Sequence, residues 1–196
     1  MDDRTRTESV RSAYRLRGQP GVLAISISGL GVASVTARKN SLADLMAAIA
    51  DLYGLQLLDG PRYVASQRCG AAGVAPRRWL AMTESAPSGW ASQLAEELRG
   101  LAAVVDLSAA YVVTRLQGEY VRAALSRLVP VDLHPTVFRV GAVAVTDLER
   151  APVILIHRSA ESFELLTARS YAADVEMSLC EAAREWGYIR SVGDKT

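Results

Sequence analysis

Apolar positions recur along this chain with two different spacings, and each spacing predicts one kind of element. Short apolar runs bounded by glycine, proline and polar turn residues are typical of β-strands, whereas apolar residues three and four positions apart indicate amphipathic helices. Strand patterns occupy residues 22–28, 32–37, 63–66, 78–82, 111–117, 142–146, 152–157 and 162–167. Helical patterns occupy residues 41–53, 88–100, 119–129 and 171–186. The order strand, helix, strand, helix occurs twice, so we expect an α+β fold with two pseudo-repeated halves.

The links between successive strands decide how the expected sheets are built. Most of these links are short, which favours largely antiparallel sheets with the helices packed on one face. Gly29 and Gly31 predict a hairpin between the first two strands. Residues 153–156 form an uninterrupted apolar run, which is typical of a strand covered on both faces. Residues 60–76 are rich in glycine and alanine, so we expect a connection with at most one short strand there.

The helix ends carry their own signals. Ser41 and Asp44 have the spacing of a capping box, and Gly54 is placed to end that helix. Ser170 and Gly187 have the residue types expected before and after the last helix. The expected buried faces are Leu42, Leu45, Met46, Ile49, Leu52 and Tyr53 in the first helix, Trp90, Leu94, Leu98 and Leu101 in the second, Val121, Ala124, Leu125, Leu128 and Val129 in the third, and Tyr171, Val175, Leu179, Ala182 and Trp186 in the fourth.

Composition divides the chain into three parts. Residues 1–20 form a polar, arginine-rich arm, which is either a frayed terminus or a segment that becomes ordered against an acidic groove of a partner. Residues 21–187 form the domain, with halves at about 21–101 and 102–187, and residues 188–196 form a C-terminal tail. A net charge of +1 in 196 residues gives no field that would gather nucleic acid or a membrane, so neither is expected as a partner. The start of the chain lacks an apolar leader pattern, which favours a cytoplasmic location.

The residues that could carry chemistry are few and scattered. Cys69 and Cys180 are the only cysteines, and their spacing indicates neither a zinc site nor a disulfide framework. His134 is expected to bond within its own turn, and His157 to lie at a polar rim or an interface. The carboxylates Asp132, Asp147, Glu149, Glu161 and Glu164 are interpreted as solvated charges. We therefore expect no catalytic, cofactor-binding or metal-binding residue in this chain.

Two stretches together resemble one family. They are VVDLSAAYVVTRLQGEYVRAALSRLVPVDLHPTVFRVGAVAVTDL and PVILIHRSAESFELLTARSYAADVEMSLCEAAREWG, and they resemble the gamma subunit of heterotetrameric sarcosine oxidase. The resemblance implies a fold related to the folate-binding T-protein of glycine cleavage. It also implies a non-catalytic structural subunit beside alpha, beta and delta subunits, with alpha as the main partner. The resemblance places FAD, FMN, NAD and tetrahydrofolate on those other subunits.

The resemblance also carries expectations about activity and contacts. Such a complex oxidatively demethylates sarcosine to glycine and transfers the one-carbon unit to tetrahydrofolate, although related complexes act on other N-methylated amines. Within this interpretation, Arg115, His134, Arg158 and Arg169 are candidates for polar contacts with the partner. The alternative is a stand-alone folate-binding or aminomethyltransferase-like one-carbon protein. Such enzymes are longer chains, and residues 68–70 do not reproduce the KGCYxGQE motif of the related iron-sulfur assembly factors.

Overall fold

The computed structural model describes residues 20–84 and 86–192, and within these residues the chain forms two β-sheets. The six-stranded sheet has the order β11 (Tyr188–Val192), β1 (Val22–Ile27), β7 (Tyr111–Gln117), β10 (Ser162–Ala168), β9 (Ala151–Ser159) and β8 (Val143–Leu148). The five-stranded sheet has the order β3 (Tyr63–Ala65), β4 (Gly70–Ala75), β5 (Arg78–Thr83), β2 (Gly31–Ala37) and β6 (Ala102–Asp106). Neighbouring strands are antiparallel except β1 and β11, which are parallel. The expected α+β fold with largely antiparallel sheets is confirmed.

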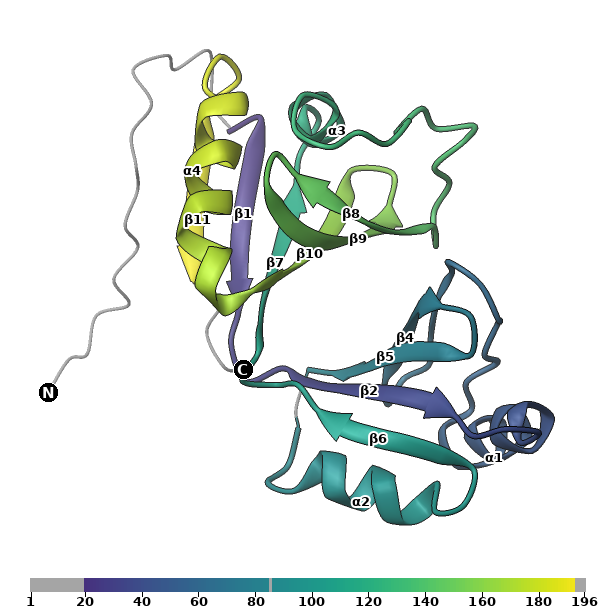
Figure 1. The fold of residues 1–196 in the computed structure, drawn as a ribbon. Helices are drawn as coiled ribbons and strands as arrows, with labels where there is room; N and C mark the ends of the chain where they lie inside the picture. The colour runs from purple at the N-terminus through teal and green to yellow at the C-terminus, as the bar shows by residue number, and fades with distance from the viewer. Residues whose placement is uncertain (1–19, 85, 193–196) are drawn as a thin grey trace, which may run out of the picture.

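The helices cover the outer faces of the two sheets, which gives four layers (Figure 1). The helices α3 (Val121–Ser126) and α4 (Ala172–Ala182) pack on the six-stranded sheet, and a short 3-10 turn, η1 (Arg169–Tyr171), leads into α4. The helices α1 (Leu42–Tyr53) and α2 (Trp90–Glu97) pack on the five-stranded sheet. The inner faces of the two sheets meet in an apolar core that includes Leu80, Met82, Ile154 and Leu166.

Strand β9 shows why the sheets must be covered on both sides. Val153 and Leu155 point to the helical layer, while Ile154 and Ile156 point to the other sheet. All four side chains are buried. Successive side chains of a strand project to opposite faces, so both faces of β9 are covered. The prediction of a strand covered on both faces is therefore confirmed.

The chain crosses between the sheets where a hairpin was predicted. Gly29 has a φ of 74°, and after it the chain leaves the six-stranded sheet and enters the five-stranded one. Strand β1 pairs with β7 and β11, whereas β2 pairs with β5 and β6. The hairpin prediction was wrong, because β1 and β2 belong to different sheets and each pairs only with strands distant in sequence.

Because the chain crosses between the sheets, the two sheets do not coincide with the predicted halves at about 21–101 and 102–187. Strand β1 belongs to the sheet formed mainly by the later residues, and β6 at residues 102–106 belongs to the sheet formed by the earlier ones. The two sheets therefore do not follow a boundary at Leu101. The expected tail also begins inside a sheet, because β11 at residues 188–192 pairs with β1. The predicted arm at residues 1–20 lies outside the described residues except for Pro20.

Strand β4 was not predicted, because its small residues carry no strand-like apolar signal. The small size has a steric reason, since a Cβ atom at Gly73 would lie 1.8 Å from the carbonyl oxygen of Gly60. The segments around Gly60 and Gly73 are therefore in close backbone contact. The backbone of residues 61–63 also bonds toward the other sheet: the Tyr63 amide donates to the Gly141 oxygen at 2.7 Å, and the Val143 amide donates to the Pro61 oxygen at 3.0 Å. The glycine- and alanine-rich stretch therefore forms a strand beside the place where the sandwich closes.

The helix ends differ from the sequence predictions in detail. Ser41 forms no side-chain cap on α1, and Tyr171 rather than Ser170 precedes α4. Leu52 is 40% exposed, so it lies off the buried face that Leu45 and Ile49 occupy. Gly54 and Gly187 do adopt positive φ angles of 62° and 82° as expected. The complete predicted face of the third helical segment is buried, although α3 itself is shorter than residues 119–129.

The buried face of α3 can be tested with Leu125→Asp. Leu125 is fully buried under the six-stranded sheet, so an unpaired charge there should lower the free energy of unfolding by about 3 kcal/mol or more. Ala123→Asp is the matched control, because Ala123 lies on the exposed side of the same helix. Urea denaturation of both variants measures the difference. Equal losses in the two variants would contradict this packing.

Candidate functional site

A group of charged residues lies at the end of the apolar core between the two sheets. Arg115 on β7 stands directly opposite Glu164 on β10, and Arg158 follows on β9. All three side chains share the face of the six-stranded sheet that packs against the five-stranded sheet, because they alternate in register with the core residues Val113, Leu166 and Ile156. Charge therefore replaces apolar packing at this end of the sandwich.

Glu164 is the centre of this group. Its side chain is only 5% exposed, and a buried carboxylate is stable only when it is paired and hydrogen-bonded. Oε1 accepts hydrogen bonds from Arg115 Nε at 3.1 Å and Nη2 at 2.8 Å, while Oε2 accepts one from Arg158 Nη1 at 3.2 Å. Burial alone would lower the pKa of Arg115, but its bonds to Glu164 and Glu84 outweigh this and raise the pKa.

Two further residues link this group to the five-stranded sheet. Glu84, just after β5, accepts a hydrogen bond of 2.6 Å from Arg115 Nη2. The Arg158 guanidinium lies 4.1 Å from the centre of the Tyr63 ring on β3, in cation–π geometry. Each arginine thus touches both sheets. We call Tyr63, Glu84, Arg115, Arg158 and Glu164 the inter-sheet cluster.

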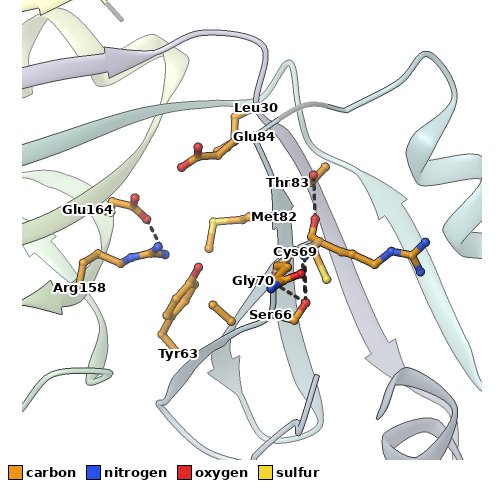
Figure 2. Close-up of a pocket in the computed structure, with 13 residues that line it drawn as sticks. Leu30, Tyr63, Ser66, Cys69, Gly70, Met82, Thr83, Glu84, Arg158 and Glu164 are labelled. Carbon is orange, nitrogen blue, oxygen red and sulfur yellow. Dashed lines mark hydrogen bonds and ion pairs between the residues drawn. The ribbon is translucent and has the colours of Figure 1, made fainter. Parts of the chain in front are cut away.

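A cavity of about 410 Å³ opens beside the inter-sheet cluster. Arg158 and Glu164 form one side of it, and Ser66, Cys69 and Thr83 stand on the other, as Figure 2 shows. The Ser66 hydroxyl donates to the Cys69 carbonyl oxygen, and the Thr83 hydroxyl donates to the Arg68 carbonyl oxygen. The full lining is Leu30, Tyr63, Ala65, Ser66, Gln67, Arg68, Cys69, Gly70, Met82, Thr83, Glu84, Arg158 and Glu164.

The structure brings together two of the four residues proposed from the sequence as partner contacts. Arg115 and Arg158 meet on Glu164. Arg169 is engaged elsewhere, because its Nε donates to the Ala109 oxygen at 2.8 Å. His134 bonds within its own turn, where Nδ1 lies 2.8 Å from Thr136 Oγ1, as the sequence predicted. Whether any of the four contacts a partner stays a prediction.

Two sequence predictions about polar residues were wrong. Glu164 was interpreted as a solvated charge, but it is buried and paired. His157 was placed at a polar rim or an interface, but it is only 2% exposed, and its ring lies nearly parallel to those of Phe163 at 4.5 Å and Phe138 at 6.0 Å in one aromatic cluster. The local sequence did indicate burial, because Glu164 lies between Phe163 and Leu165 in an apolar strand, but it did not indicate which partners Glu164 would have. A polar residue in such a run is either paired or costly.

The bonds of His157 fix its tautomer. Nδ1 lies 2.9 Å from the Phe138 carbonyl oxygen, which can only accept, so Nδ1 carries the proton. Nε2 lies 3.1 Å from Arg122 Nη2 and accepts from it. Burial lowers the pKa of Arg122, whose guanidinium also lies 5.0 Å from the Phe163 ring centre. These contacts tie the loop before β8 to the helical layer.

The cysteines are held in the fold as thiols. Burial raises the pKa of Cys69, although Ser66 and Arg68 act in the opposite direction. Burial likewise raises the pKa of Cys180, which packs against the core beneath α4. Across residues 20–84 and 86–192, no three His, Cys, Asp or Glu side chains gather in a way that could hold a metal ion. In the same residues, no helix has the length and apolar character needed to cross a membrane.

Comparison with solved structures defines the class of fold. The chain is similar to aminomethyltransferase T of the glycine cleavage system from Bartonella henselae, with a TM-score of 0.63 and 14% identity over 88% of this chain and 48% of that one. It is also similar to a chain of heterotetrameric sarcosine oxidase from Corynebacterium sp. U-96 in complex with pyrrole 2-carboxylate. That match has a TM-score of 0.77 and 23% identity over 94% of this chain and 92% of the other. The fold is therefore that of the aminomethyltransferase-like proteins.

The sequence comparisons show the family. Residues 39–185 match the model of the sarcosine oxidase, gamma subunit family, and the chain belongs to that family. The curated sarcosine oxidase subunit gamma from Corynebacterium sp. (strain U-96) is 32% identical over 83 residues, which are 42% of this chain. The matched stretch spans 40% of the length of that relative. The resemblance seen in the sequence and the expected fold are both confirmed.

The role of Glu164 can be tested with Glu164→Gln. The change removes the charge that neutralises two partly buried arginines, so unfolding should become easier by about 3 kcal/mol. Glu181→Gln is the matched control, because the Glu181–Arg184 pair is largely exposed and should contribute less than about 0.5 kcal/mol. Urea denaturation at constant pH gives both values. A loss for Glu164→Gln no larger than that of the control would show that the cluster does not stabilise the sandwich.

The tyrosines predict how stability depends on alkaline pH. Burial raises the pKa of Tyr63, against the opposing effect of Arg158, and burial also raises the pKa of Tyr188. An unfolded tyrosine ionises near a pH of about 10. The two protonated tyrosines therefore contribute fully to the free energy of unfolding below that pH. Their contribution is lost as the pH rises above it, because the tyrosines of the unfolded chain lose their protons first. Urea midpoints should fall as the pH rises past 10, and the fall should be smaller in Tyr63→Phe; an equal fall in that variant would contradict the assignment for Tyr63.

Proposed function

We propose that this chain is the structural, non-catalytic gamma subunit of a heterotetrameric sarcosine oxidase-type complex. The complex would oxidatively demethylate sarcosine to glycine and transfer the one-carbon unit to tetrahydrofolate. The observation that carries the proposal is the family match over residues 39–185. The similarity in fold to a chain of the Corynebacterium heterotetramer supports it.

The proposal assigns the reactive groups to the partners. Alpha, beta and delta subunits would carry FAD, FMN, NAD and tetrahydrofolate, with alpha as the main neighbour of this chain and the cytoplasm as the location. The contacts within the chain support a structural role, because its histidines and its buried glutamate bond to other residues of the fold. His134 bonds within a turn, His157 packs with two phenylalanines in one aromatic cluster, and Glu164 is bound by two arginines. These groups already serve the fold.

The loop around His134 supplies a surface for the partner. His134 is exposed, and in the same loop Val137 is 61% exposed and Val140 58%. Apolar side chains surrounded by polar residues are typical of protein interfaces. We place the contact with the large subunit on this loop, with His134 at its edge. Arg169, also exposed, is retained as a second polar contact.

Co-purification tests the assembly. A tagged full-length chain expressed in its native host should retain larger subunits with a flavin absorption spectrum, while the chain expressed alone should be colourless. Mass spectrometry identifies the retained chains, and oxidation of sarcosine compared with dimethylglycine by the purified complex identifies the amine. A tagged chain that purifies without companions, or that carries flavin by itself, would overturn the proposal. Saturable binding of tetrahydrofolate to the chain alone would favour the one-carbon protein instead.

The same experiment locates the interface. Val137→Asp with Val140→Asp should reduce the yield of retained subunits by about tenfold or more, because it places two charges in an apolar contact. Val105→Asp is the control, since Val105 is 56% exposed on β6, the edge strand of the five-stranded sheet opposite β3. Circular dichroism confirms that each variant is folded. Full retention by the double variant, or equal loss by the control, would place the interface elsewhere.

A further inference from the structure

The guanidinium of Arg158 is held in place but incompletely used. Nη1 donates to Glu164, and one face of the group covers the Tyr63 ring. An arginine has five N–H donors in a fixed planar fork, and in Figure 2 the Arg158 side chain extends into the cavity. We propose that this cavity is a binding site for a small organic carboxylate, which the guanidinium of Arg158 recognises.

The arrangement of charges favours an anion at this point. Arg115 has two carboxylate partners, Glu164 and Glu84, whereas Arg158 shares only Glu164 and makes the longer bond, 3.2 Å against 2.8 Å. Arg158 is thus the less neutralised of the two cations. A planar carboxylate can accept two parallel N–H bonds from a guanidinium, an arrangement that a single ammonium group cannot provide.

The surroundings of Arg158 prepare it for binding. Glu164 on one side and the Tyr63 ring beneath fix the plane of the guanidinium, so little rotational freedom is lost when a ligand binds. Gly70 makes room for this arrangement, because a Cβ atom there would lie 2.0 Å from the Tyr63 hydroxyl oxygen. The aromatic platform therefore depends on a residue without a side chain.

The rest of the cavity suits the body of such a ligand. Leu30 and Met82 give it apolar surface, while Ser66 and Thr83 place hydroxyl oxygens on the wall opposite Arg158. The volume of about 410 Å³ lies within the range of roughly 300–1,000 Å³ that is typical of small-molecule sites. Glu84 and Glu164 also line the cavity, but each is paired with arginine, and Arg68 bonds to the Leu52 oxygen. The Arg158 fork, the apolar walls and the hydroxyl groups together fit a compact carboxylate with a hydrocarbon or aromatic body.

Benzoate is the probe that tests the site, and benzyl alcohol is its uncharged control. Titration of the full-length, isotopically labelled chain should give saturable chemical-shift changes in the millimolar range for benzoate. The changes should centre on the amides of Gly70 and Thr83 and on the methyl group of Met82. Benzyl alcohol should bind clearly more weakly. Equal binding of the two compounds, shifts located away from the cavity, or no saturable shift with benzoate would overturn the proposal.

A pair of variants tests the charge without touching the inter-sheet cluster. Ala65 lines the cavity and is exposed, so both Ala65→Glu and Ala65→Gln should fold. The added carboxylate should weaken benzoate binding about fivefold, whereas the amide of the same shape should leave it nearly unchanged. Arg158→Lys, which keeps the charge but loses the fork, should also weaken binding. Equal affinities in the glutamate and glutamine variants would refute recognition by charge, and the outcome is independent of whether the chain assembles with partners.

Discussion

The buried carboxylate of Glu164 is the constraint around which the two sheets are arranged. A charge removed from water must be neutralised by partners with fixed geometry, and two arginines on neighbouring strands provide it. Those arginines in turn reach Glu84 and Tyr63 of the other sheet. The apolar core between the sheets ends at this point, and a cavity opens beside the charged residues. The apolar packing and the ion pairs between the two sheets therefore meet at Glu164.

The sequence predicted those elements whose signal is local. Strand β7 was expected at residues 111–117 and lies there, and the run at 153–156 correctly indicated burial on both faces. The partners of β1 and β2 could not be predicted in the same way, because Gly29 is compatible both with a hairpin and with a crossing between sheets. Strand β4 was missed because residues 70–73 are glycine and alanine, whose small size serves a close backbone contact rather than a hydrophobic pattern.

The candidate site was predicted only in part. Arg115 and Arg158 were selected as polar contacts, but nothing local indicated that Glu164 would join them, since the three residues come from three strands whose register depends on the whole sheet. The fold itself does not supply the function, because similar folds serve different chemistry. Membership of the gamma subunit family is the basis of the proposed structural role, while the cavity is a separate property of this chain.

The position of β1 has a consequence for the order in which the molecule forms during synthesis. β1 lies between β7 and β11, so it must wait for residues 111–117 and then for residues 188–192 before both of its edges are paired. The complete five-stranded sheet lies between β1 and β7 in the chain and depends on contacts closer in sequence. Local contacts form sooner than distant ones. The five-stranded sheet can therefore assemble while the ribosome is still adding the later strands, whereas the six-stranded sheet closes only after β11 has been made.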